Sequence, residues 1–141
     1  MQLQRLAVAV GLTALISTAC GDSTGITVED LVGTWNATQY HYTDNANPAG
    51  QVDLIPLGAS FEMIVVAAGT VAVVFDDGQG GTSSDSGTFN GTMTTLTIGG
   101  STFSAQRSGD VLTLTDATSS YDFDDNGSDE PATLEIQLVR Q

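Results

Sequence analysis

From Gly33 onward, apolar and polar residues alternate with a period of two. Such alternation indicates β-strands with one buried face. The short gaps are rich in glycine, asparagine and aspartate, as in hairpin turns. Gaps this short join antiparallel neighbours, because a parallel return needs about a dozen residues or more. The sequence therefore predicts an all-β, antiparallel up-and-down meander that closes into a barrel of about 8–10 strands. We expect the strands at 33–43, 51–57, 59–68, 70–76, 85–90, 92–98, 101–107, 110–116, 117–123 and 132–140.

The alternation also assigns the two faces of the sheet. Glu62, Glu135 and Gln137 fall at positions that face water. The predicted inward residues share one parity within each strand: Phe61, Met63, Val65, Val71, Val73, Phe75, Leu96, Ile98, Phe103, Ala105, Leu112, Leu114, Leu134, Ile136 and Leu138.

One helical turn is expected before the first strand, over 27–32. Thr27 stands at its N-cap, and Asp30 follows three residues later, in the place of a capping box. Residues 64–68 (Ile-Val-Val-Ala-Ala) are apolar on both faces, and we expect the helical turn to cover their outer side. The alternative is an exposed patch for a partner.

The start of the first strand, Leu31-Val32-Gly33-Thr34-Trp35, resembles the opening of lipocalins and of bacterial lipocalin-like lipoproteins. The layout of residues 27–141 is also similar to theirs. The resemblance implies a barrel whose end is plugged by Trp35, with Gly33 beside it and Arg140 of the last strand over the ring. A guanidinium over an indole gains about 0.5–2 kcal/mol.

The N-terminus has the layout of a secretory signal. Arg5 precedes the apolar run 6–16, and the small residues 17–19 (Ser-Thr-Ala) lead to Cys20, the only cysteine. The run is too short to span a bilayer, which takes roughly 20 apolar residues. A cysteine directly after the cut resembles the lipobox of bacterial lipoproteins. The resemblance implies cleavage after Ala19 and acylation of Cys20 by chains such as palmitate.

The predicted organisation is therefore a lipoprotein signal peptide (1–19), a lipidated tether (20–26) and a lipocalin-like β-barrel domain (27–141). The residue after Cys20 is not aspartate, and resemblance to the known sorting pattern favours the outer membrane over the inner one. A soluble, secreted chain with a free thiol is the alternative. In either case the location is extracytoplasmic, and a lone cysteine allows no internal disulfide.

The chain is strongly acidic, with 17 acidic residues against three basic ones. Without residues 1–19, only Arg107 and Arg140 remain as basic residues. Such a surface repels nucleic acid, because its phosphates need basic partners. It can attract cations.

A calcium loop is the sharpest candidate for a metal site. Asp122, Asp124 and Asn126 stand two apart and are followed by Gly127, like the first half of an EF-hand loop. The twelfth position is Thr133 instead of glutamate, and Glu130 is out of register. The alternative is an acidic hairpin loop in solvent. Calcium is the one cofactor that the sequence suggests.

Catalytic patterns are missing from the sequence. His41 is the only histidine, and the chain has neither a Gly-x-Ser-x-Gly elbow nor a phosphate-binding loop. We expect a membrane-anchored, non-catalytic barrel that binds a small apolar molecule or a protein partner. The alternatives are a structural, weakly calcium-binding lipoprotein with a filled core and, third, an enzyme without a recognisable constellation of residues.

Overall fold

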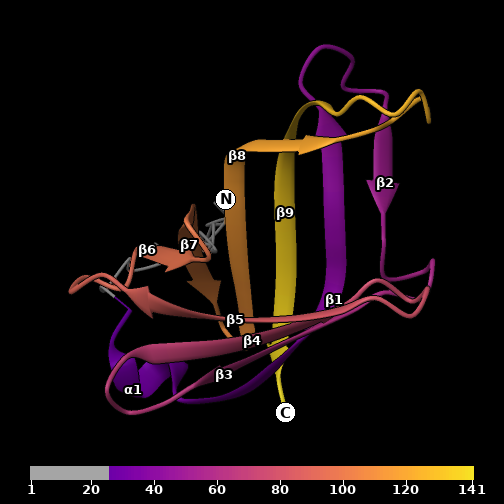
Figure 1. Ribbon diagram of the computed structural model, residues 1–141. Helices are drawn as coiled ribbons and strands as arrows, with labels where there is room; N and C mark the ends of the chain where they lie inside the picture. Colours follow the sequence, from indigo (N-terminus) through magenta and orange to yellow (C-terminus); the bar gives the residue numbers. More distant parts are fainter. Residues whose placement is uncertain (1–25) are drawn as a thin grey trace, which may run out of the picture.

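The computed structural model describes residues 26–141, so the predicted signal segment and Cys20 lie outside the described residues. Figure 1 shows one short helix, α1 (Val28–Leu31), followed by a succession of strands. The strands are β1 (Gly33–Asp44), β2 (Gln51–Asp53), β3 (Ser60–Val65), β4 (Thr70–Asp76), β5 (Thr82–Phe89), β6 (Thr95–Ile98), β7 (Ser101–Ser108), β8 (Val111–Tyr121) and β9 (Glu130–Arg140). No helix in this part of the chain is long and apolar enough to cross a membrane.

All strand pairs are antiparallel, and the last strand returns to the first. The order β1-β3-β4-β5-β6-β7-β8-β9 closes through the pairing of β9 with β1, while β2 lies beside the C-terminal half of β1. The structure thus confirms the all-β, up-and-down meander and its closure, with eight strands in the ring. Closure removes the exposed edges of the outermost ring strands.

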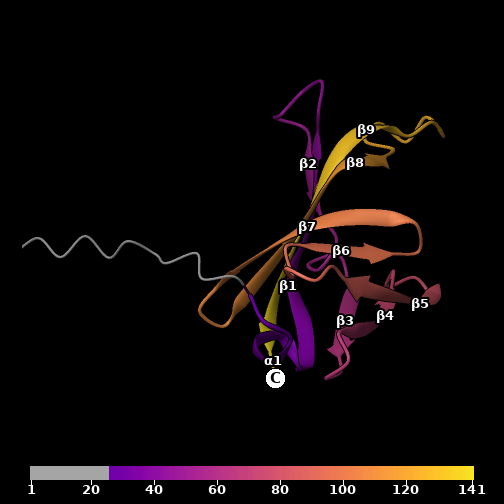
Figure 2. The same ribbon diagram turned by 90° about the vertical axis from the view of Figure 1, so that its left-hand side faces the viewer.

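The core fills the inside of the ring. The inward residues predicted from the alternation are buried, apart from Phe75, which is half-buried. Trp35, Leu31 and Leu138 are fully buried at one end. Figure 2 shows α1 and the C-terminus together at this end, with β2 and the β8–β9 hairpin at the opposite end. We call these the closed end and the open end.

Several strand boundaries differ from the prediction: 59–68 ends at Val65, 85–90 begins at Thr82 and 92–98 begins at Thr95, and two further differences are larger. The expected strands 110–116 and 117–123 form one strand, β8, whose register against β9 shifts between Asp116 and Ser119. Such a bulge bends a strand without ending it. The expected strand 51–57 ends at Asp53, because a turn follows. The Oδ1 atom of Asp53 accepts the N–H of Ile55 at 3.1 Å, which favours that turn.

The prediction that the helical turn covers the outer side of residues 64–68 is wrong. Ile64 and Val66 are 40% and 47% exposed. The α1 helix packs against the core instead, and Val28 lies close to Gly69 in the β3–β4 hairpin. The helix is drawn inward because its Leu31 fills the closed end. The use of the exposed residues as a partner-binding patch stays a prediction.

Gly87 of β5 pairs with both neighbouring strands, with Val71 of β4 and with Ile98 of β6. A Cβ on this residue would lie 2.8 Å from Cγ1 of Ile98 and closer still to the carbonyl oxygen of Thr97. Only three residue pairs join β5 to β6, so this contact is part of a narrow seam. A glycine at a tight barrel corner allows such a close backbone approach.

Gly87→Ala should therefore destabilise the barrel by about 1–3 kcal/mol, since overpacking forces neighbours apart. Gly91→Ala is the matched control: Gly91 is exposed, and a Cβ there would meet nothing within 4 Å. Denaturant unfolding of both variants measures the difference. Equal stabilities would show that β5 and β6 are not packed this closely.

Candidate functional site

At the closed end, the Trp35 indole is enclosed by the segment that precedes it. Its Nε1–H donates to the carbonyl oxygen of Leu31 at 2.7 Å, so the polar edge of this fully buried ring is satisfied. The helix that carries Leu31 is capped as the sequence predicts: Thr27 and Asp30 form a capping box. The short helix is thereby held over the end of the barrel.

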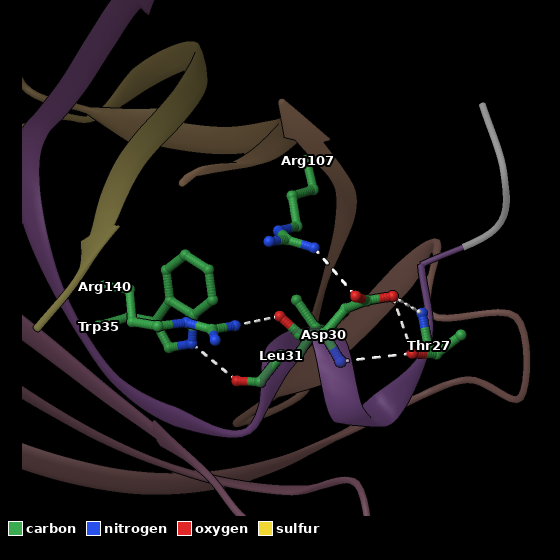
Figure 3. A network of polar contacts seen from close by, with 6 residues as sticks. All are labelled: Thr27, Asp30, Leu31, Trp35, Arg107 and Arg140. Carbon is green, nitrogen blue, oxygen red and sulfur yellow. Dashed lines mark hydrogen bonds and ion pairs between the residues drawn. The ribbon is translucent and has the colours of Figure 1, made fainter. Parts of the chain in front are cut away.

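Both arginines of the described residues meet at this helix, as Figure 3 shows. The guanidinium of Arg140 lies 4.8 Å from the centre of the Trp35 ring and donates to the carbonyl oxygen of Asp30. Nη1 of Arg107 lies 3.1 Å from Oδ1 of the same aspartate. Gly33 follows the C-cap residue of α1, Val32, and has a φ of 135°, a backbone conformation that favours glycine. The structure thus brings Gly33, Trp35 and Arg140 together at the closed end.

Hydrogen bonding makes Asp30 more acidic. The backbone N–H and the hydroxyl of Thr27 both donate to its carboxylate, and Arg107 adds a positive charge, so the pKa of Asp30 lies below its ordinary value. The ionised form of Asp30 makes these contacts best, so its ionisation contributes to holding α1 at the closed end.

At the open end, six aromatic rings form a connected cluster, which we call the mouth cluster. Tyr40 of β1 contacts Phe61 of the neighbouring strand β3 and Phe75 of β4, with ring centres 5.8 and 5.0 Å apart. The cluster continues along the other side from Tyr42 to Tyr121 at 4.8 Å, and on to Phe123 at 5.1 Å. Five of the six rings are half-buried, the exception being the buried Phe61.

Burial keeps the two phenols of β1 neutral. Desolvation is the main cause that raises the pKa of both Tyr40 and Tyr42. The mouth cluster is therefore an uncharged surface that is partly accessible to solvent. It was not predicted as a site; the signal was the run Tyr40-His41-Tyr42, which places both tyrosines on the inner face.

The barrel wall is incomplete beside the mouth cluster. Residues 82–86 of β5 pair with β4 but have no partner in β6. Ser83 and Asp85 pair with the inward residues Phe75 and Val73, and yet both are exposed. Solvent therefore reaches the inner face of the sheet at this height.

Asp116 is a charged residue on the inner face of β8. It continues the buried series Leu112, Leu114 and is only 5% exposed. Its Oδ1 accepts the N–H and the hydroxyl of Thr118 at 2.8 and 2.7 Å. Asp116 and Tyr42 both pair with Leu134, from opposite sides. Asp116 was not predicted as a site residue, although its position two residues after the inward Leu114 indicates that its side chain points inside.

The acidic loop gathers carboxylates in a different combination from the predicted one. Oxygen atoms of Asp122, Asp124 and Glu130 all lie within 4.8 Å of one another, so Glu130 joins the group in spite of its register. The backbone N–H groups of Asn126 and Gly127 donate to Asp122 at 3.1 and 2.8 Å. The side-chain oxygen of Asn126 accepts the N–H of Ser128 at 2.8 Å. These bonds hold the loop as a turn, and the calcium site stays a prediction.

Other surfaces offer less chemistry. A depression of about 350 Å³ between β1 and β3 has a mixed lining of apolar and polar residues: Asn36, Ala37, Ile55, Ala59, Ser60, Phe61 and Glu62. A second, of about 380 Å³, lies over the β5–β6 seam and is lined by serine, threonine and glycine. His41 makes no side-chain hydrogen bond among residues 26–141.

Comparisons with known protein families, with curated proteins and with solved structures found no significant match.

The closed end should respond to acid through Asp30. Its pKa is lowered in the folded chain, so its stabilisation is complete above the unfolded value of about 3.9 and is lost as the pH falls through the folded value. The difference in Tm between the parent and Asp30→Asn should be largest at neutral pH and shrink below about pH 4. Glu29→Gln is the control, because the Glu29 carboxylate accepts no hydrogen bond within 26–141. The Tm difference between this variant and the parent should be smaller and should change less with pH. A gap that persists at low pH would contradict this account.

The calcium prediction can be tested on the loop itself. Calcium that binds only the folded chain raises Tm by mass action, and magnesium should do less, because it keeps its water. Asp124→Asn should lose most of the calcium response and keep the sodium chloride response. Asp110→Asn removes one charge outside the loop and serves as the control. If calcium raises the Tm of Asp124→Asn as much as that of the parent, the loop is a solvated turn and holds no calcium.

Proposed function

We propose that this chain is a lipoprotein of the cell envelope whose non-catalytic, lipocalin-like barrel binds a small apolar molecule at its open end. The observation that carries the binding role is the contrast between the two ends. Trp35, Arg140 and α1 plug one end, while half-buried aromatic rings line the other. A half-exposed apolar surface inside a barrel mouth is a usual place for a small ligand.

The membrane anchor rests on the sequence of residues outside the described part. The apolar run ends in Ser17-Thr18-Ala19, and Cys20 follows directly. Two or more acyl chains on Cys20 would hold the protein stably at a membrane, whereas one chain binds only marginally. The outer membrane is the proposed site, with the barrel outside the cytoplasm.

Mass spectrometry of the N-terminus from the native host tests the anchor. We expect a chain that begins at Cys20 and carries the added mass of its acyl groups. An unmodified Cys20 peptide would contradict the anchor and leave the binding role to be judged separately.

Titration with the neutral fluorescent probe N-phenyl-1-naphthylamine tests the binding role. Tyr121→Ser removes a ring from the middle of the mouth cluster and should weaken binding by up to about tenfold, since an aromatic contact is worth about 0.5–1.5 kcal/mol. Val66→Ser is the matched control, because Val66 is 47% exposed in the hairpin at the closed end. If no neutral probe binds, the filled-core alternative is correct.

A further inference from the structure

The two ends of the barrel differ in charge. Arg107 and Arg140 both lie at the closed end, against Asp30. The open end has no lysine or arginine among residues 26–141, whereas its loops and strand ends are acidic. The acids there are Asp44, Asp76, Asp77, Asp122, Asp124, Asp125, Asp129 and Glu130. Charges of one sign around an opening reinforce each other, so this end attracts cations and repels anions.

The rings of the mouth cluster suit the same kind of ligand. An aromatic face carries negative quadrupole charge and attracts ammonium groups, most strongly where water is displaced. Tyr42 and Tyr121 lie nearly parallel, with ring centres 4.8 Å apart, at the inner side of this end. They offer apolar contact area and cation–π attraction together.

Asp116 supplies a counter-charge inside the mouth. Only 5% of Asp116 is exposed to solvent. Both of its hydrogen bonds from the described residues end on Oδ1, which leaves Oδ2 without a donor from this part of the chain. Oδ2 is not one of the fully buried atoms that lack a partner within residues 26–141, so it stays accessible to a ligand. Asp116 therefore has the capacity to accept a donor or a positive charge from a ligand beside Tyr42.

We propose that the open end binds a small organic cation with an apolar body, such as an aryl- or alkylammonium, with its nitrogen near Asp116 and its body on Tyr42 and Tyr121. The inference rests on the proposed function, which places the ligand at this end, and adds the charge that the ligand carries. Fatty acids and other anionic amphiphiles are not expected to bind, because residues 26–141 place no lysine or arginine at this end to pair with them.

Two probes of the same shape separate charge from apolar contact. Benzyltrimethylammonium and its uncharged isostere 2,2-dimethylpropylbenzene are titrated, by ligand-observed NMR, into the acylated protein on zwitterionic nanodiscs, with empty nanodiscs subtracted. The cation should bind at least about tenfold more tightly, because an interaction with a charged partner is worth about 1.5–3 kcal/mol. Added sodium chloride should weaken the binding of the cation and leave the binding of the isostere unchanged.

Asp116→Asn removes the charge and keeps an oxygen for Thr118. This substitution should weaken the binding of the cation about tenfold and leave the binding of the isostere unchanged. Asp110→Asn is the control: it removes one charge from the β7–β8 turn at the closed end, so it should change cation binding less than twofold. In the parent, the cation should shift the ring signals of Tyr121 and not those of Trp35, which reports the site even if Asp116→Asn fails to fold.

Four results would overturn the inference. If the isostere binds as tightly as the cation, or if Asp110→Asn weakens the cation as much as Asp116→Asn does, the specific counter-charge is wrong while the apolar site stands. If the ring signals of Trp35 shift instead, the ligand lies at the other end. If neither probe binds, the inference and the proposed binding role fail together.

Discussion

The pairing of β9 with β1 is the constraint on which the rest of the structure depends. It runs from Trp35 opposite Arg140 to Asp44 opposite Ala132, and it turns an open meander into a ring. Because of it, the last arginine of the chain lies over the only tryptophan, and its guanidinium reaches the helix that precedes the first strand. Residues more than 100 positions apart in sequence thus meet at one end of the barrel.

The same closure separates the two ends by chemistry. One end uses both arginines to hold the capped helix, through Asp30 and the Trp35 ring. The other end has aromatic rings and carboxylates. There, residues 82–86 of β5 pair with β4 but not with β6, so the sheet is interrupted. A chain this acidic repels itself, so placing its few cations where they seal the core stabilises the fold. The open end then keeps an excess of negative charge, which is the basis for inferring a cationic ligand.

Much of the fold could be predicted because strand periodicity is a local property. The inward residues of β3, β4 and β6–β9 and the capping box of α1 follow from spacing alone. The bulge in β8 could not be predicted, because it depends on how β8 pairs with β9. The same holds for the direction in which α1 packs, which leaves Ile64 and Val66 exposed. At the candidate site, Asp116 and the mouth cluster are brought together by the pairing of β1 and β8 with β9, and a linear pattern does not show such cross-strand neighbours.

Amide hydrogen exchange along β9 tests the closure most directly. In the closed ring, alternate amides of this strand face β8 and the others face β1, so both sets should exchange only through global or near-global opening, at similar slow rates. Val139 and Leu138 belong to the stretch that pairs with both neighbours. If one alternating set of β9 amides instead exchanges as fast as the exposed loop 124–129, then β1 and β9 are not paired, the ring is open, and the closed end built on Trp35 and Arg140 does not exist.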